Sequence, residues 1–416
     1  MAKWMPPELT HESVQIMPSS GDHHHSEAAR VVWLVNSLGA GNSLLYWGEI
    51  LAKYVGAFPA TKVFVGAGRT RRIPGTSHDV QRLPSFTLRL GRRTNSYNRM
   101  VQILSPTVLR RVAAHQPDVL IVMEFNLLSL YAVLSRRWLR PARILLLVES
   151  QPRRCNPRLI DWFDRRLRRF ICERVDLILT NNASGRRHLE DTLSVDPHKI
   201  RSSPYLASHV PGTENRRNED RHQRHDLGDA DKTVFVYVGQ LIERKGVFEL
   251  INGVHATPPA IRQQCRFWLV GDGDQRQRIV DRIRELGLDD VIRVLGPCRY
   301  EELWRYYVAA DVFVNPTLQD YRALVGFEAL QFGLPLFQSV RDGAAEEIVE
   351  KGENGFTFDP RNAAETAEGI EWFVAHANEL GRLGERSAEL AKLFSVETAV
   401  ESLTSATRSC RGIVAK

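Results

Sequence analysis

The stretch Val234–Gly246, VFVYVGQLIERKG, decides the fold class of this chain. Its first five residues are apolar and predict a buried strand, Gly239 ends that strand, and a helix is expected to begin near Gly246. An apolar strand that leads through a glycine into a helix is typical of a parallel βαβ unit. Lys245 then stands beside a helix start, where a cation suits a phosphate. A solvated lysine at a helix start is the alternative, and this stretch alone favours it.

The same alternation recurs on both sides of this stretch. Downstream strands are expected at Phe267–Val270, Val291–Leu295, Val312–Val314 and Pro335–Gln338, with helices at Gln275–Leu286, Tyr300–Ala309, around Glu328, at Ala344–Lys351 and over Ala363–Phe394. Upstream strands are expected at Val31–Val35, Lys62–Val65, Val119–Met123, Ile144–Val148 and Leu177–Thr180, with a helix at Ser43–Tyr54. We therefore predict an α/β fold with two Rossmann-like, doubly wound domains that face a cleft.

Composition sets the domain boundaries. Residues 1–29 are predicted to be a disordered tail, 30–207 an N-terminal domain, 208–231 a polar linker, 232–395 a C-terminal domain, and 396–416 a helix that packs back on the N-terminal domain. Two domains are the natural expectation for 416 residues. No apolar run approaches the roughly 20 residues of a membrane span, and no secretory signal is evident.

Charge is divided unevenly along the chain. Residues 1–205 hold 30 Lys or Arg against 16 Asp or Glu, a balance of +14, and the remainder holds 26 against 33, a balance of −7. The basic half suggests an anionic partner, either nucleic acid or an anionic membrane surface. Five cysteines without CxxC spacing argue against disulfides and a zinc site, and indicate a reducing cytoplasm.

Two carboxylates eight positions apart mark the segment Phe313–Phe332, FVNPTLQDYRALVGFEALQF. Asp320 and Glu328 lie between a short strand and a helix that stops at Gly333. Helix N-termini attract anions, and carboxylates near them accept hydrogen bonds from sugar hydroxyls. A phosphate-bearing sugar is the first ligand to consider, although helix capping explains acidic residues there equally simply.

A glycine loop follows the first predicted strand. Gly39 and Gly41 could let the backbone approach a diphosphate, with a plain tight turn as the alternative. The loop lacks the third glycine of the dinucleotide fingerprint, and no acidic residue about 20 positions on ends a second strand. A dehydrogenase is therefore a poor interpretation.

Six ordered blocks resemble the C-terminal domain of family 4 glycosyltransferases (group 1), which have the GT-B fold and a retaining mechanism. The blocks are VYVGQLIERKGV, LVGDGDQ, VLGPCRYEELWRYYVAADVFVNPT, the segment with Asp320 and Glu328, GLPLFQS and GENGFTFDP, over residues 232–395. The first half is more loosely similar to the acceptor-side domain of the family through PDVLIVMEFN, LLLVES, VDLILTNNASGRRHLE and HKIRSSPY.

The resemblance implies a role for each matching residue. Lys245 would neutralise the donor diphosphate, Asp320 would contact the transferred sugar, and Glu328 would accept hydrogen bonds from the nucleotide ribose. These three form the expected catalytic set. The expected donor-binding set is Gly39, Gly41, Gly239, Gln240, Lys245, Arg322, Leu324 and Glu328. No metal and no other cofactor is expected beyond the nucleotide-diphosphate sugar itself.

The chain departs from the family pattern at several positions. Gln240 stands where an arginine is usual, which removes one cation from the diphosphate, and Arg322 is the candidate replacement. The first acid is Asp320 rather than Glu, and Ala323 replaces a usual glycine. The acceptor-side strand ends in Glu149 and Ser150, where the family often has a histidine. These changes leave room for an unusual donor or for lost activity.

A basic helix is predicted over Ile160–Val175, IDWFDRRLRRFICERV. Apolar residues at 160, 163, 167, 170 and 171 share one face, and Arg165, Arg166, Arg168 and Arg169 lie off it. The helix could rest on anionic lipid, or it could pack on the core with a solvated arginine face. Nucleic-acid binding has less support, because no aromatic-interleaved basic strand is present.

We therefore predict a hexosyltransferase-type enzyme that moves a sugar from a nucleotide-diphosphate sugar to a glycan or lipid-linked acceptor, in cell-surface polysaccharide or glycolipid synthesis. It would be cytoplasmic, peripheral on the cytoplasmic face of the membrane through its basic domain, and would not bind nucleic acid. The alternatives are a catalytically silent sugar-nucleotide-binding protein and a sugar-nucleotide epimerase of the same fold.

Overall fold

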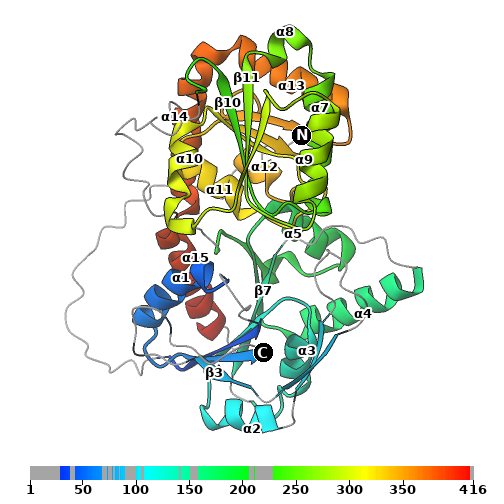
Figure 1. The fold of residues 1–416 in the computed structure, drawn as a ribbon. Coiled ribbons are helices and arrows are strands. Elements are labelled where there is room, and N and C mark those ends of the chain that lie inside the picture. The colour runs from blue at the N-terminus through cyan, green and yellow to red at the C-terminus, as the bar shows by residue number, and fades with distance from the viewer. Residues whose placement is uncertain are drawn as a thin grey trace, which may run out of the picture.

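The computed structural model describes residues 29–37, 43–67, 73, 77, 80–83, 85–89, 100–104, 107–139, 142–149, 158–205, 210 and 228–412. Within these residues the chain forms two α/β domains that lie one above the other (Figure 1). The predicted tail before Ala29, the glycines Gly39 and Gly41, and most of the predicted linker 208–231 fall outside the described residues.

The N-terminal domain is built on a parallel sheet of seven strands in the order β3-β2-β1-β6-β7-β8-β9. In chain order these strands are β1 (Val31–Ser37), β2 (Lys62–Ala67), β3 (Val80–Arg82), β6 (Val119–Met123), β7 (Arg143–Val148), β8 (Leu177–Thr180) and β9 (Ile200–Ser202). A separate antiparallel pair joins β4 (Ser85–Arg89) to β5 (Met100–Leu104). The strands β3, β4, β5 and β9 were not expected from the sequence, because β3 and β9 have only three residues and polar residues interrupt the apolar ones in β4 and β5.

Helices cover both faces of this sheet because successive residues of a strand point to opposite sides. Trp33 of β1 packs on one side with α1 (Ser43–Ala57) and α15 (Val396–Gly412). Leu34 packs on the other side with α2 (Thr107–Ala114), α3 (Leu127–Leu134) and α4 (Arg158–Arg174). The last helix of the chain thus lies on the N-terminal domain, beside α1 (Figure 1).

The C-terminal domain has a parallel sheet of six strands in the order β12-β11-β10-β13-β14-β15. These strands are β10 (Thr233–Val238), β11 (Cys265–Val270), β12 (Ile292–Gly296), β13 (Val312–Asn315), β14 (Leu336–Ser339) and β15 (Gly355–Phe358). Helices α7 (Val247–Ala256), α9 (Arg276–Glu285) and α13 (Ala363–Ala375) cover one face. Helices α10 (Trp304–Ala309), α11 (Leu324–Gln331), α12 (Ala345–Ile348) and α14 (Leu380–Ala391) cover the other.

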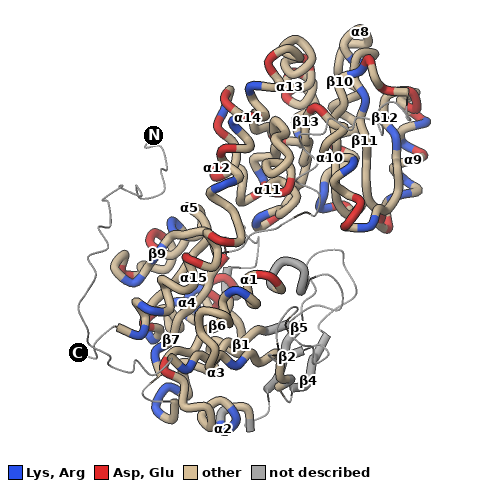
Figure 2. The backbone as a smooth tube through the Cα atoms, turned by 90° about the vertical axis from the view of Figure 1, so that its left-hand side faces the viewer, with Lys and Arg blue, Asp and Glu red and all other residues tan. Residues whose placement is uncertain are grey.

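The predicted fold class is confirmed: both sheets are parallel and both are covered on two faces. Arginines are frequent on α4 of the N-terminal domain, and two glutamates lie on α12 of the C-terminal domain. Figure 2 shows how the charged residues are distributed along the chain. The helical stretch expected over Ala363–Phe394 is interrupted between α13 and α14, where His376 ends the first helix.

Candidate functional site

The site lies where the order of strands reverses in the C-terminal sheet. The strand β10 is flanked by β11 on one side and by β13 on the other, so the loops after β10 and β13 leave in different directions. In parallel sheets a ligand binds at the carboxyl ends of the strands at such a point. Lys245 follows β10, Asp320 follows β13 and Asp342 follows β14, so three charged residues share this edge.

Gly246 holds the first two of these loops together. Its φ is +68°, and a Cβ placed there would lie 2.0 Å from the carbonyl oxygen of Pro316, so no other residue fits without movement. The short helix η4 (Glu243–Lys245) is fixed to the loop after β13, because the Arg244 carbonyl accepts hydrogen bonds from Leu318 N at 2.8 Å and Thr317 Oγ1 at 3.0 Å. The backbone therefore sets Lys245 next to Asp320.

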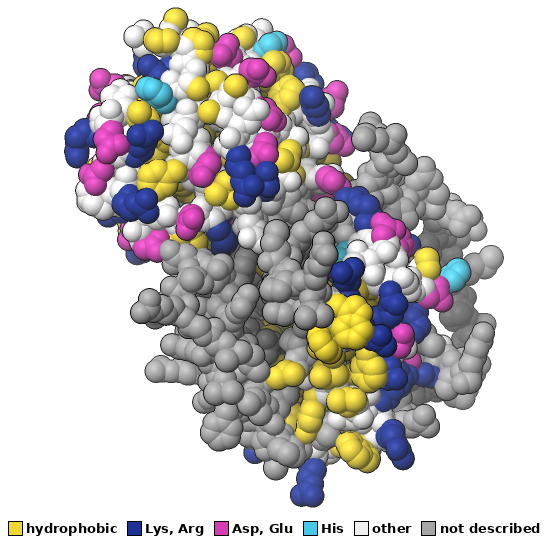
Figure 3. Space-filling view, turned by 90° about the vertical axis from the view of Figure 1, so that its right-hand side faces the viewer, with side chains coloured by type: hydrophobic (Ala, Val, Ile, Leu, Met, Phe, Trp, Pro, Cys, Tyr) yellow, Lys and Arg dark blue, Asp and Glu magenta, His cyan; other side chains and the backbone are white. Residues whose placement is uncertain are grey.

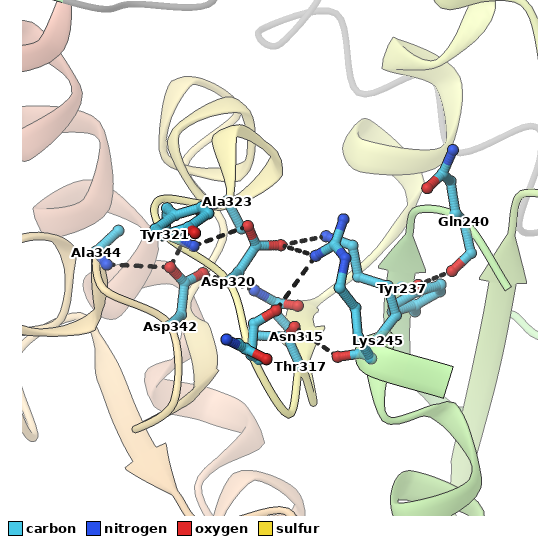
Figure 4. Close-up of polar contacts among 12 residues, drawn as sticks. Tyr237, Gln240, Lys245, Asn315, Thr317, Asp320, Tyr321, Ala323, Asp342 and Ala344 are labelled. Atoms are coloured by element: carbon cyan, nitrogen blue, oxygen red, sulfur yellow. Dashed lines mark hydrogen bonds and ion pairs between the residues drawn. The ribbon is translucent and has the colours of Figure 1, made fainter. Parts of the chain in front are cut away.

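Two cations converge on one oxygen of Asp320 (Figure 4). Lys245 Nζ lies 2.7 Å and Arg244 Nη1 2.8 Å from Asp320 Oδ2. Burial acts to raise the pKa of Asp320, but Lys245 and Arg244 outweigh it and hold that pKa below its ordinary value. The site thus contains an ionised carboxylate and two cations in a region where charge interactions are poorly screened.

Asp342 supports Asp320 from the neighbouring loop. Asp320 N donates to Arg341 O at 3.3 Å, and Gly343 N donates to Asp320 O at 3.1 Å. The buried carboxylate of Asp342 accepts from Asn315, Gln338, Ala323 N and Ala344 N at 2.6–3.2 Å. Burial and the charge of Asp320 raise the pKa of Asp342 to about 6, against the opposing effect of the two backbone donors.

Glu328, in the middle of α11, is 1% exposed. Tyr300 Oη donates to its Oε1 at 3.2 Å, and Tyr307 Oη donates to its Oε2 at 2.9 Å. A carboxylate is an acceptor with two oxygens, and each oxygen of Glu328 accepts from one tyrosine hydroxyl. We did not expect the two tyrosines to contact Glu328, because they lie outside the acidic segment.

The end of β10 is shaped by close backbone contact rather than by charge. A Cβ on Gly271, at the end of β11, would lie 1.8 Å from the carbonyl oxygen of Gly239. Tyr237 Oη donates to the Gln240 carbonyl at 2.7 Å, and the Gln240 amide points away from Asp320 (Figure 4). Gln240 is therefore held by its backbone, while its side chain is exposed to solvent.

Arg322 does not join Lys245 at Asp320. Its side chain is 1% exposed and pairs with Glu347, Nη2 to Oε2, at 3.4 Å. The guanidinium carbon stands 3.8 Å from the centre of the Phe327 ring, a cation–π arrangement. Burial raises the pKa of Glu347 to about 7, even though Arg322 acts to lower it. The extra cation at the site is Arg244, which sequence reasoning passed over although it adjoins Lys245.

The N-terminal domain meets this site through its own strand ends. Leu324, the first residue of α11, packs against the apolar cores of both domains. Glu149, directly after β7, has its pKa raised by burial, with Arg322 opposing and Asp320 adding to that effect. Glu149 N donates to Glu124 Oε1 at 2.8 Å. An ion pair between Arg187 and Glu346 links the domains nearby.

Among the described residues, no cluster of three or more His, Cys, Asp or Glu side chains is arranged to bind a metal ion. The described helices are also too short or too polar for any of them to span a bilayer.

Comparison with known proteins finds a family model and several relatives that match part of the chain. Residues 218–390 match the family model described as glycosyl transferases group 1. A lipopolysaccharide core biosynthesis glycosyltransferase of Rhizobium meliloti is 31% identical over 175 residues, which are 42% of this chain and 49% of the relative. A D-inositol 3-phosphate glycosyltransferase of Geodermatophilus obscurus is 28% identical over 248 residues, 57% of this chain and 53% of the relative. The matches thus span about half the length of these curated relatives.

Solved structures extend the likeness to both domains. The crystal structure of HepE from Anabaena in complex with UDP superposes with a TM-score of 0.71 at 18% identity, over 91% of this chain and all (100%) of that one. WaaG, a glycosyltransferase involved in lipopolysaccharide biosynthesis, gives a TM-score of 0.59 at 16% identity, over 89% of this chain and 98% of that one. At such identities the likeness concerns the fold.

Proposed function

We propose that this chain, whose residues 218–390 match the family model of group 1 glycosyltransferases, is a GT-B enzyme that transfers a sugar from a nucleotide-diphosphate sugar to a glycan or lipid-linked acceptor with retention of anomeric configuration. The observation that carries the proposal is the convergence of Lys245 and Arg244 on Asp320 at the reversal point of the C-terminal sheet. Their arrangement suits a ligand that brings both negative charge and hydroxyl groups.

The two cations would bind the donor diphosphate. When the bond between the anomeric carbon and the diphosphate breaks, its electron pair leaves on the diphosphate, and negative charge grows there. Lys245 and Arg244, once bound to the diphosphate, would stabilise this charge in the transition state. They would supply the neutralisation that a divalent metal provides in other transferases, which is why we propose a reaction without a metal.

The carboxylates would orient the donor. Glu328 can accept from the two ribose hydroxyls, and Asp320 can accept from hydroxyls of the transferred sugar once the diphosphate has drawn the cations toward itself. The acceptor hydroxyl would attack the anomeric carbon on the face that the diphosphate leaves, and its proton would pass to the departing diphosphate oxygen. No protein nucleophile is required, and Glu149 faces this region from the N-terminal domain.

The proposal is tested by turnover with a panel of UDP-, GDP-, ADP- and dTDP-sugars, with hydrolysis and transfer measured separately. Glu328→Ala is compared with Glu368→Ala, an exposed glutamate on α13 that serves as the matched control. We expect wild type and the Glu368 variant to turn over at least one donor, and the Glu328 variant to lose about 100-fold or more in kcat/KM. Wild-type turnover no greater than that of Glu328→Ala with every donor contradicts the proposal.

Calorimetry with the same donors separates the alternatives. Binding of a nucleotide sugar without any product would indicate a silent binding protein. Conversion of the donor to an isomer without an acceptor would indicate an epimerase. The proposal requires a glycosylated product together with release of the nucleoside diphosphate.

A further inference from the structure

An exposed apolar surface covers the outer side of α3 and α4 in the N-terminal domain. It consists of six large side chains, which we call the α3–α4 patch: Leu127, Leu134, Trp138, Trp162, Phe163 and Leu167. Trp138 is 72% and Phe163 65% exposed, although side chains of this size are normally at least half buried. An apolar patch of this kind marks an interaction surface more often than a random feature of the fold.

The exposure arises from the way α4 is attached to the domain. Among its side chains that the structure describes, Ile171 and Cys172 of the last turns are buried in the core, and the first half of the helix projects from the domain (Figure 1). The inward position one turn earlier is occupied by Arg168, whose Nε is 2.7 Å from Asp164 Oδ2 and whose guanidinium stands over the Phe125 ring at 5.0 Å. Phe163 and Leu167 are thereby turned to solvent, which argues against a helix that buries its whole apolar stripe.

Arginines border the patch. Figure 3 shows hydrophobic side chains gathered on this face of the N-terminal domain, with Lys and Arg beside them. The helix α4 carries six Arg against three Asp or Glu, and Arg165, Arg166 and Arg169 are exposed. The Trp162 ring lies 4.8 Å from the Phe163 ring and 4.9 Å from the Arg166 guanidinium. Aromatic rings, leucines and guanidinium groups are therefore presented together.

We propose that the α3–α4 patch docks the protein on the surface of an anionic lipid bilayer. Tryptophan favours the boundary between acyl chains and headgroups, because its ring is apolar and its N–H is polar. Arginine side chains at the border can extend along the apolar surface and place their charge among anionic headgroups. A protein partner would match the apolar side chains equally well, but the excess of positive charge on α4 is complementary to an anionic headgroup layer.

Docking at this surface goes beyond sugar transfer and does not depend on it. None of the six side chains belongs to the residues that we assign to the donor. The experiment is therefore co-sedimentation of the full chain with vesicles of phosphatidylcholine, with and without phosphatidylglycerol, at low and high salt. Nucleotide binding is measured in parallel by calorimetry, so that a failure of docking is distinct from a failure of the proposed function.

Two double variants, each with a matched control, test the apolar part and the charged part of the α3–α4 patch. Trp162→Ser with Phe163→Ser removes exposed aromatic area, and its control is Val340→Ser with Leu393→Ser, which are 52% and 39% exposed on the C-terminal domain. Arg165→Gln with Arg166→Gln removes two charges, and its control is Arg282→Gln with Arg284→Gln on α9. Arg168 is left unchanged because it is buried.

We expect wild type and both controls to sediment with anionic vesicles far more than with neutral ones. The aromatic variant should bind at least about tenfold more weakly, and the arginine variant roughly fivefold more weakly per arginine at low salt. All variants should retain nucleotide binding and an unchanged melting temperature. Wild type that remains in the supernatant with anionic vesicles overturns the proposal. So does a dimer that dissociates when Phe163 is replaced, because the patch would then bind a second copy of the chain.

Discussion

The ammonium nitrogen of Lys245 lies 2.7 Å from Oδ2 of Asp320, so the cation and the carboxylate that we assign to the donor neutralise each other in this structure. A donor diphosphate must compete with Asp320 for Lys245 and Arg244. Once it does, Asp320 becomes available to the hydroxyls of the sugar. The ion pair therefore couples recognition of the phosphate to recognition of the sugar, and the two can be separated by substitution.

Asp320→Asn should lower kcat/KM for transfer by about 100-fold or more, because the sugar loses its ionised acceptor. It should not weaken the binding of the nucleoside diphosphate, since the competing charge on Lys245 and Arg244 has been removed. Calorimetry with UDP, or with whichever diphosphate the donor screen identifies, checks this. If Asp320→Asn lost as much affinity for the diphosphate as a substitution of Lys245, Asp320 would position the two cations for the diphosphate and would not compete with the diphosphate for them.

Lys245→Met should weaken nucleoside diphosphate binding and lower kcat by roughly 100-fold, because one of two charge-stabilising donors is lost. Nucleoside monophosphate binding should change much less, since the cation is assigned to the departing diphosphate. Arg244→Gln should act in the same direction, whereas Arg282→Gln on α9 should have no effect. If Lys245→Met weakened the binding of the nucleoside monophosphate as much as that of the diphosphate, Lys245 would contact another part of the nucleotide.

Glu347 should make the stability of the protein depend on pH. Its pKa is raised to about 7 by burial, so the folded state holds a proton that the unfolded state releases at lower pH. This contribution is fully present below the unfolded pKa of about 4.5 and is lost as pH rises through 7, with a size of roughly 3 kcal/mol. The free energy of unfolding should therefore fall between pH 5 and pH 8.

Glu347→Gln should flatten that slope, because a neutral amide cannot ionise. The neighbouring Glu346→Gln is the matched control, since its side chain is 66% exposed, and it should leave the slope unchanged. Urea unfolding at a series of pH values measures the effect. Identical slopes in wild type and Glu347→Gln would mean that Glu347 titrates normally in the folded protein.

The helix α15 should stabilise the N-terminal domain. Leu403 is fully buried in the core of that domain, and Tyr54 Oη lies 2.8 Å from Thr407 Oγ1. Leu403→Ala should destabilise this domain by about 2–5 kcal/mol through the cavity it leaves, whereas the exposed Glu401→Ala should stay within about 0.5 kcal/mol. Limited proteolysis should cut the N-terminal domain of the Leu403 variant first, and prior loss of the C-terminal domain would contradict the assignment.

The fold was predictable because parallel strands buried on both faces are apolar throughout. The strands expected at Val119–Met123 and Leu177–Thr180 coincide with β6 and β8. The short edge strands β3 and β9 were missed, because an edge strand of three residues has no periodicity to detect.

The three main residues of the candidate site could be found in the sequence, but the side chains that contact them could not. The spacing of Lys245, Asp320 and Glu328 in the chain marks them out, whereas the direction of a side chain depends on packing. Arg322 lies inside the acidic segment, whereas Arg244 adjoins Lys245 and is far from that segment in the chain. The structure turns Arg322 onto the Phe327 ring and Arg244 toward Asp320. Tyr300 and Tyr307 reach Glu328 only through the fold of η5 (Tyr300–Glu302) and α10.

The position of α15 has a consequence for synthesis on the ribosome. One side of the N-terminal core is completed by Val396, Ala399, Leu403, Ala406 and Cys410, which are translated after every strand of the C-terminal sheet. Domains usually fold in the order in which they emerge. The core of the N-terminal domain can therefore be completed only after the whole C-terminal sheet has been translated.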